Sequence, residues 1–177
     1  MKDQSVIVET DRLALCAPEL CHIDALAALW GDLETMRYLG AGGVWTREQV
    51  AERIERAIRV QAERGMTFWT VVEKASGTVI GQGGLVPIAF IGDEIELGYR
   101  LGKAHWGKGY ATEIARLSAA HGFGALGLTD LVAVCYPENL ASRRVLIKTG
   151  FTEVGESDAY YGVPTVVHRM NTNDCVR

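Results

Sequence analysis

The sequence has few of the residues on which several protein classes depend. It contains only four cysteines in 177 residues, Cys16, Cys21, Cys135 and Cys175, and none of them form a CxxC pair. No Cys/His cluster has zinc-site spacing, and no HExxH motif is present, so nothing in the sequence predicts a metal site. We expect reduced thiols in a cytoplasmic protein.

Long apolar runs and an excess of positive charge are also lacking. No apolar run approaches the ~18 residues of a membrane span, and residues 1–10 contain acids but no apolar segment typical of a signal peptide. The formal net charge is −4. The arginines between Arg53 and Arg64 are interleaved with glutamates, which is typical of a solvated helix face. We therefore expect neither a membrane nor a nucleic-acid partner.

The hydrophobic pattern predicts an α/β or α+β domain with helices packed on a central sheet. No repeat, linker or low-complexity tract divides the chain, so we expect a single domain over residues 1–177. Helices are expected at Ile23–Trp30 (continuing irregularly toward Leu39), from Thr46, at Tyr110–Phe123 and after Asn139. Strands are expected at Arg12–Cys16, Met66–Glu73, Val79–Val86, Glu94–Leu101, Leu131–Tyr136, Phe151–Val154 and Thr165–Met170.

The strand Glu94–Leu101 carries a charged face. Its side chains alternate, with Ile95, Leu97, Tyr99 and Leu101 on one face and Glu94, Glu96, Gly98 and Arg100 on the other. Glu96 is therefore a carboxylate on an otherwise apolar strand, where partial burial would raise its pKa. Ion pairing with Arg100 on the same face is the alternative.

A glycine-rich turn, Leu101 to Thr112, joins this strand to the next helix. Gly107 and Gly109 allow a tight turn, and the helix then begins with unpaired N–H groups, a combination suited to binding a phosphate. Two common phosphate motifs fit poorly. A P-loop would need a Ser/Thr after Lys108, where Gly109 stands, and a dinucleotide fingerprint would need a third glycine, where Thr112 stands. A purely structural turn is a further alternative.

The segment Trp106-Gly107-Lys108-Gly109-Tyr110-Ala111 resembles the Gln/Arg-x-x-Gly-x-Gly/Ala signature of GNAT acetyltransferases, with Trp106 replacing the usual Gln or Arg. Three further segments resemble the RimJ/RimL-like branch of that superfamily. They are Thr10-Asp11-Arg12-Leu13-x-Leu15, Glu96-Leu97-Gly98-Tyr99-x-Leu101, and the stretch from Asn139 to Phe151, in which Ile147 stands where the branch commonly has glutamate. The resemblance covers nearly the whole chain.

The resemblance implies a GNAT fold, with a mixed sheet of about seven strands flanked by helices. It also implies a splayed strand pair, between the strands ending near Leu101 and Tyr136, that holds acetyl-CoA as co-substrate without a metal. The residues implied for cofactor binding are Leu101, Trp106, Gly107, Lys108, Gly109, Tyr110, Ala111, Thr112, Asn139 and Ser142.

The implied reaction is acetyl transfer from acetyl-CoA to a primary amine by direct attack. Glu96 is the candidate base, acting directly or through water. Ser142 is the candidate acid toward the departing thiolate, and Tyr136 is a second candidate. Both Ser142 and Asn139 could instead serve the start of their helix, Ser142 by bonding back to the backbone and Asn139 as its cap.

The acceptor is an amine, either a protein N-terminus or a small molecule, and the acidic balance of the chain suits a basic one. Aromatic side chains in the regions where this fold builds its acceptor pocket are candidate contacts: Trp30, Tyr38, Trp45, Tyr160 and Tyr161. Dimers are common in the family, so a homodimer is among the expected assemblies. A non-catalytic acyl-CoA-binding regulatory domain is the alternative function.

Overall fold

The computed structural model describes residues 5–39, 43–88 and 93–172. Its helices are α1 (Ile23–Trp30), α2 (Leu33–Met36), α3 (Arg47–Arg64), α4 (Tyr110–Gly124) and α5 (Leu140–Lys148). Its strands are β1 (Val6–Glu9), β2 (Leu13–Cys16), β3 (Phe68–Glu73), β4 (Thr78–Pro87), β5 (Ile95–Leu101), β6 (Asp130–Cys135), β7 (Thr152–Ser157) and β8 (Thr165–Asn171).

Local sequence signals fix the ends of the two helices that matter most for the site. At the start of α3, Thr46 and Gln49 form a capping box, each side chain accepting from the other residue's backbone N–H. Asn139 caps α5 by accepting from the backbone N–H of Ser142 at 3.1 Å. The helix start expected at Thr46 and the cap considered for Asn139 are thus confirmed.

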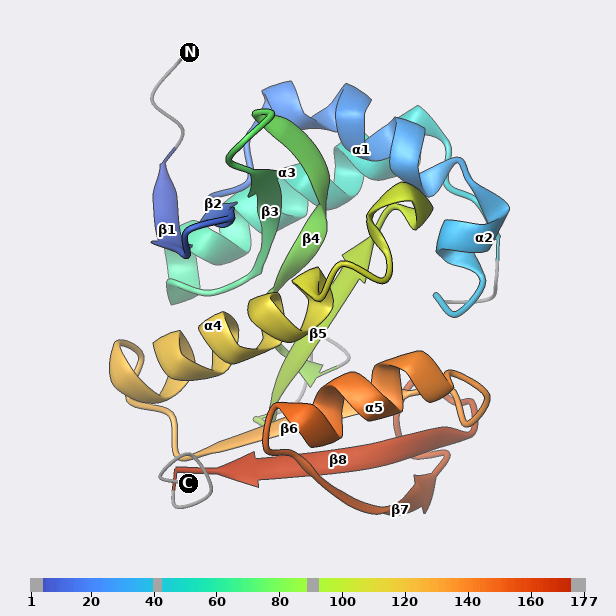
Figure 1. Ribbon diagram of the computed structural model, residues 1–177. Helices are drawn as coiled ribbons and strands as arrows, with labels where there is room; N and C mark the ends of the chain where they lie inside the picture. Colours follow the sequence, from blue (N-terminus) through green and yellow to red (C-terminus); the bar gives the residue numbers. More distant parts are fainter. Residues whose placement is uncertain (1–4, 40–42, 89–92, 173–177) are drawn as a thin grey trace.

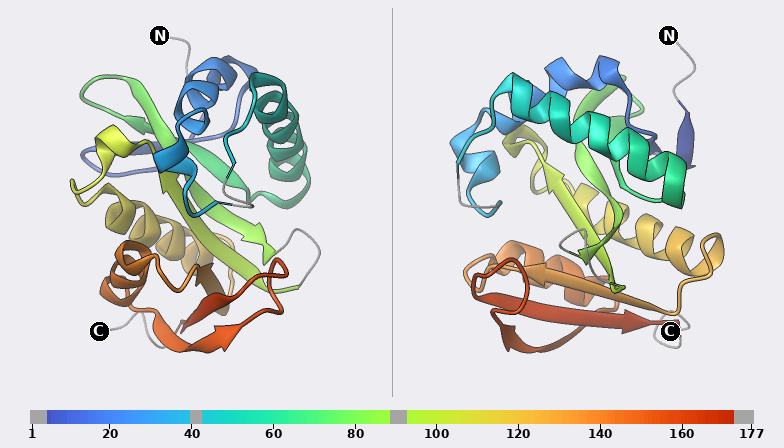
Figure 2. Two further views of the ribbon diagram at one scale, coloured as in Figure 1. Left: turned by 90° about the vertical axis from the view of Figure 1, so that its right-hand side faces the viewer. Right: turned by 180° about the vertical axis from the view of Figure 1, so that it is seen from behind.

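The strands form one eight-stranded sheet in the order β1-β2-β3-β4-β5-β6-β8-β7. Helices α4 and α5 lie over one face of the sheet, and α1 and α3 lie over the other face of its N-terminal half (Figures 1 and 2). The main core lies between the sheet and α4, where Ile114, Ala115 and Ala119 pack on β4 and β5 side chains such as Leu85 and Leu97. A second cluster around Leu26, Trp30 and Ile54 joins α1 to α3.

Strands β5 and β6 are the one parallel pair among the neighbouring strands of this sheet, and they barely touch. A single register pair, Glu96 with Val132, joins them, whereas β4–β5 and β6–β8 are paired along their lengths. Beyond that point each strand is hydrogen-bonded to a sheet neighbour on one side only. The sheet therefore splits between β5 and β6, as the predicted fold requires.

The α/β architecture is confirmed, and each predicted strand is present to within a few residues. The eighth strand, β1, is an addition to the sequence prediction and forms the sheet's edge beside β2. Within the described ranges, no helix has the length and apolarity needed to span a bilayer. Cys175 lies outside the described residues.

Candidate functional site

The glycine turn between β5 and α4 exposes the start of a helix. Gly107 and Gly109 have φ of +75° and +81°, left-handed conformations that favour glycine. Gly109 is the N-cap of α4, and no side chain caps that helix, so its first N–H groups remain available to a ligand. An uncapped first turn with the positive end of the helix dipole is suited to bind a phosphate or pyrophosphate.

Two side chains hold this turn in place from its edges. The indole N–H of Trp106 donates to the carbonyl of Leu101 at 2.7 Å, so the residue that replaces Gln or Arg closes the turn back onto the end of β5. Arg12 donates to the carbonyl of Lys108 at 3.1 Å and forms an ion pair with Glu113. Because that ion pair neutralises the one acid in the first turn of α4, an anion bound there meets less repulsion.

A cavity of about 500 Å³ opens where β5 and β6 separate. Its walls include Glu96 to Arg100 of β5, Ala133 to Tyr136 at the end of β6, Ser142 and Leu146 of α5, and several α3 side chains. Helices α5 and α3 lie on opposite faces of the sheet (Figure 2). Because residues of both helices line the cavity, it reaches from one face of the sheet to the other between the two strands. An elongated ligand with a reactive group at one end could enter the cavity from one face of the sheet and meet a second substrate on the other face.

Glu96 lines this passage at the point where β5 and β6 still pair. The side chain is 7% exposed, and the hydroxyl of Tyr161 donates to its carboxylate. Burial raises the pKa of Glu96 to about 7, against the smaller lowering effect of the Tyr161 hydrogen bond. The alternative ion pair is not formed, because Arg100 instead donates to the side-chain carbonyl of Gln82 at 2.9 Å.

Ser142 is paired with a tyrosine on the other face of β5. The hydroxyl of Tyr99 lies 2.9 Å from Ser142 Oγ, and either oxygen can be the donor. Burial raises the pKa of Tyr99, so its hydroxyl stays protonated at neutral pH. Together with Cys135, whose pKa is raised to about 11 mainly by burial, these groups line the α5 side of the cavity.

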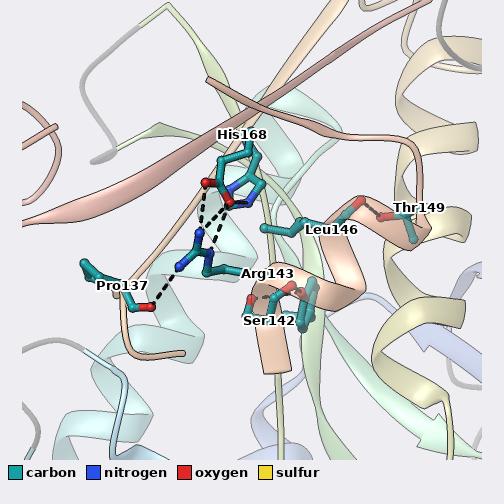
Figure 3. A network of polar contacts seen from close by, with 8 residues as sticks. Pro137, Ser142, Arg143, Leu146, Thr149 and His168 are labelled. Atoms are coloured by element: carbon teal, nitrogen blue, oxygen red, sulfur yellow. Dashed lines mark hydrogen bonds and ion pairs between the residues drawn. The ribbon is translucent and has the colours of Figure 1, made fainter. Parts of the chain in front are cut away.

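A polar network fastens the start of α5 to the sheet (Figure 3). Arg143 donates to both carboxylate oxygens of Glu153 on β7, at 2.9 and 3.0 Å, and to the carbonyl of Pro137 at 3.4 Å. Glu153 also lies 3.5 Å from Nε2 of the buried His168, whose pKa is lowered chiefly by burial. Ser142 is therefore held in place by the Asn139 cap, to which its backbone N–H donates, and by the ion pair that the next residue, Arg143, forms with Glu153 on β7.

The aromatic candidates for acceptor contact fall into two groups. Tyr38, Trp45 and Tyr161 line the cavity. Trp30 is 1% exposed in the α1–α3 cluster and lies behind the cavity wall. Tyr160 bonds to Glu94 at 2.9 Å and packs against Val132 and Val167, also away from the cavity. Tyr136 lines the cavity near Tyr38.

Sequence reasoning missed two features of the site. Tyr99 was assigned only to the apolar face of its strand, although a tyrosine among leucines carries a hydroxyl that must find a partner when buried. Arg53 and Arg56 line the cavity. Arg53, Arg56 and Val60 follow one another at helical spacing and therefore lie along one side of α3. This spacing is the sequence pattern from which a shared arginine face could have been predicted.

Comparison with known proteins identifies relatives of this arrangement. The family model described as "Acetyltransferase (GNAT) domain" matches residues 12–152. The uncharacterized N-acetyltransferase YoaA of Bacillus subtilis is 32% identical over 149 residues, covering 84% of each chain. The FsC-acetyl coenzyme A-N(2)-transacetylase of Aspergillus fumigatus is 29% identical over 164 residues, covering 89% of this chain and 69% of the relative.

A solved structure shows the same fold. RimL, a ribosomal alpha-N-protein acetyltransferase in complex with coenzyme A, superposes with a TM-score of 0.80 and 19% identity, covering 96% of this chain and 99% of RimL. At that identity the similarity supports the fold and says nothing about which amine this chain uses.

Proposed function

Since the chain belongs to the acetyltransferase (GNAT) family and is an acetyl-CoA-dependent N-acetyltransferase, we propose that it acts as one domain and by direct attack of a primary amine. In this proposal Glu96 is the base, and Ser142 together with Tyr99 is the acid. The observation that carries this proposal is the placement of these groups. A buried carboxylate and a hydroxyl pair flank the same split between β5 and β6, on opposite faces of the sheet.

Acetyl-CoA would bind along the α4–α5 side of the split. The first turn of α4, from Gly107 to Thr112, would hold the pyrophosphate by its backbone N–H groups. The unpaired edges of β5 beyond Glu96 and of β6 beyond Val132 offer backbone groups to the extended pantetheine, which would lie between them as an added strand. Asn139 caps α5 with its side-chain oxygen, which leaves its side-chain NH₂ group to donate to the pantetheine, so it would serve both the helix and the cofactor.

The amine must lose its positive charge before it can attack. An amine with a pKa of about 8 to 10 is mostly protonated at neutral pH. Glu96 has a pKa near 7 and faces the α3 side of the passage, where it can take the proton directly or through a water. Tyr161 orients the carboxylate and keeps a fraction of it ionised at neutral pH.

The departing thiolate of coenzyme A needs a proton in return. Ser142 Oγ lies at the start of α5 beside the split, and Tyr99 lies within hydrogen-bond distance of it. Ser142 would give its proton to the sulfur and take one from Tyr99. Of the two protons that the nitrogen loses, Glu96 would take the first and pass it to solvent. The second, shed as the amide forms, would balance the proton that Tyr99 recovers through solvent. Tyr136 lines the same cavity but lies toward Tyr38, so we assign it a wall role.

The acceptor would be a protein N-terminus or a small-molecule amine. RimL acts on a ribosomal protein and the Aspergillus relative carries the name of a transacetylase for FsC, and these names set the two substrate classes worth testing. The test is release of coenzyme A thiol from acetyl-CoA in the presence of N-terminal peptides and small amines. Acetyl-CoA binding without turnover on either panel would support the alternative, a non-catalytic acyl-CoA-binding domain.

A further inference from the structure

Three arginines surround the α3 end of the cavity. Arg53 and Arg56 come from α3 and Arg100 comes from β5, and all three line the cavity wall. Arg53 and Arg56 are exposed at its mouth, while Arg100 lies deeper and is partly buried. Helix α3 lies on the sheet face opposite α4, so Arg53 and Arg56 belong to the other face from the helix start assigned to the pyrophosphate (Figure 2).

Among the residues that the structure describes, these arginines lack the carboxylate partners that several other arginines have. Arg47 pairs with Asp24, Arg143 with Glu153 and Arg169 with Glu94. Over the part of the chain that the structure describes, no ion pair includes Arg53, Arg56 or Arg100. Burial, and then the charge of Arg53, lower the pKa of Arg100 to about 9, so the cluster is a local excess of positive charge.

Aromatic rings hold two of the guanidinium groups in fixed orientations. The Arg53 guanidinium lies 3.8 Å from the ring centre of Trp45. Arg100 lies 4.6 Å from the Trp45 ring and 4.9 Å from the Trp30 ring. Contacts with the rings use no N–H donor, so apart from the bond of Arg100 to Gln82 these guanidinium groups keep donors of the kind that bind carboxylate and phosphate groups.

The strand geometry connects this cluster to Glu96. Glu96 and Arg100 are on the same face of β5, and their Cα atoms are about 13 Å apart at the usual rise per residue. Gly98 lies between them and lines the cavity without a side chain. A Cβ at Gly98 would come within 2.8 Å of the Phe68 ring, so that ring lies directly over the strand at this point and forms the cavity wall between Glu96 and Arg100.

We propose that the acceptor is an anionic amine, in which a carboxylate or phosphate group bound by Arg53, Arg56 and Arg100 is separated by a short chain from the amine presented to Glu96. This inference rests on the proposed acetyltransferase function and names its substrate class. It replaces the expectation of a basic acceptor, which the net charge of the chain suggested. Local charge at the cavity decides binding, since exposed charges farther away are screened at physiological salt.

The test is calorimetry on the protein saturated with coenzyme A, using matched pairs of small probes. One set is a series of ω-amino carboxylates of increasing length, compared with their carboxamides. A second set, ω-aminoalkyl phosphates, distinguishes a phosphate from a carboxylate preference. We expect the best carboxylate or phosphate to bind about tenfold or more tightly than its neutral counterpart, because charge-assisted hydrogen bonds supply the difference.

Variants identify the groups responsible. Arg100→Met and Arg53→Gln should each weaken binding of the anionic probe about tenfold while leaving the carboxamide unchanged. Arg53 lies on an exposed helix face, so that variant tests the proposal even if Arg100→Met folds poorly. Arg59→Gln, on the same helix but outside the cavity, is the control and should bind both probes as the wild type does.

The outcomes also separate this inference from the proposed function. Equal binding of anionic and neutral probes, an absence of binding by any probe at millimolar concentration, or a preference that survives in both variants overturns the inference. In those cases coenzyme A release with some other amine would still support acetyl transfer. Failure of the protein to bind acetyl-CoA at all would instead count against the proposed function.

Discussion

Glu96 occupies a position that is unfavourable for an ionised carboxylate. Its side chain is buried, and the hydrogen bond from Tyr161 offsets only part of the desolvation. Between pH 4.5 and about 7 the folded protein holds a proton on Glu96 that the unfolded chain has released. The contribution of Glu96 to the free energy of unfolding therefore falls as the pH rises through this range, and above about pH 7 that contribution is constant.

Replacing this carboxylate should exchange activity for stability. We expect Glu96→Gln to be more stable than the wild type above pH 7, by up to about 3 kcal/mol, with the gain shrinking as the pH falls toward 4.5. In the wild type kcat/KM should rise as the pH passes about 7, and in the variant this ionisation should be missing. Urea unfolding and a pH–rate profile measure both; an unaltered profile would return Glu96 to a structural role.

Tyr99 and Ser142 should behave as one unit in catalysis. If the proton reaches the thiolate through both hydroxyls, Tyr99→Phe and Ser142→Ala should each lower kcat about ten- to a hundredfold, and the double variant should lower it no further. Acetyl-CoA affinity should change little, because the proton is needed only in the transition state. Additive losses in the double variant would show that the two hydroxyls act separately.

The residues of the site differ in how far the sequence could predict them. Glu96 and Ser142 could be singled out because each lies at a fixed offset from a recognisable motif on one strand or helix. The Tyr161 contact with Glu96 joins residues 65 positions apart. It depends on the loop between β7 and β8, where Tyr161 has a φ of +60°, and no local pattern encodes that path.

At the scale of elements, the turn from β5 into α4 combines a strained backbone with an uncapped helix. The positive φ of Gly109 is costly for any residue with a Cβ. A Cβ at Gly109 would lie 3.7 Å from the Arg12 guanidinium, an ordinary contact, so the protein itself leaves room for a side chain. The positive φ by itself favours glycine at this point, and the proposed pyrophosphate site would require a bare backbone there as well.

Gly109→Val tests this requirement against a matched glycine. Gly77, in the β3–β4 turn, has a φ of +68° and open space around it, so Gly77→Val carries similar backbone strain far from the site. We expect both variants to lose about 1–3 kcal/mol of stability and only Gly109→Val to lose acetyl-CoA affinity, by more than about tenfold. Calorimetry gives the affinities; equal affinities in the two variants would move the pyrophosphate elsewhere.

Elements with a strong local signature were predictable, and those that depend on a partner were not. The capping residues Thr46 and Asn139 stand directly before apolar helical patterns, so both helix starts could be predicted. Strand β1 has four residues, two of them exposed, and exists because its backbone pairs with β2 at the sheet edge. Such a short strand carries too few residues for its alternation to be recognised.

At the scale of the whole molecule, the split divides the sheet into two parts. Strands β1 to β5 form one part and β6, β8 and β7 form the other, with a single register pair between them. Helix α4 packs mainly on β4 and β5, and it also contacts α5, which lies over the second part (Figure 1). A ligand between β5 and β6 would therefore add hydrogen bonds where the sheet has none.

Acetyl-CoA should consequently stabilise the protein as a whole and protect the two facing strands in particular. At a hundredfold excess over Kd, mass action adds about 2.7 kcal/mol, which for a chain of this size corresponds to roughly 5–10 °C in Tm. Amide hydrogen exchange should slow in residues 97–101 of β5 and 133–135 of β6. The edges by which these two segments face each other are unpaired without the ligand. The same experiment on Gly109→Val, at the same acetyl-CoA concentration, should show both effects reduced, since a tenfold loss of affinity lowers the mass-action gain to about 1.4 kcal/mol.

The local and global measurements constrain each other. Uniform slowing of exchange across the sheet would be the result of mass action alone, because global unfolding limits the slowest amides. Added protection confined to the ends of β5 and β6, in excess of the global gain, requires new hydrogen bonds at the split. A rise in Tm without that excess would mean that acetyl-CoA binds the protein without joining its two half-sheets, and the added-strand arrangement would be wrong.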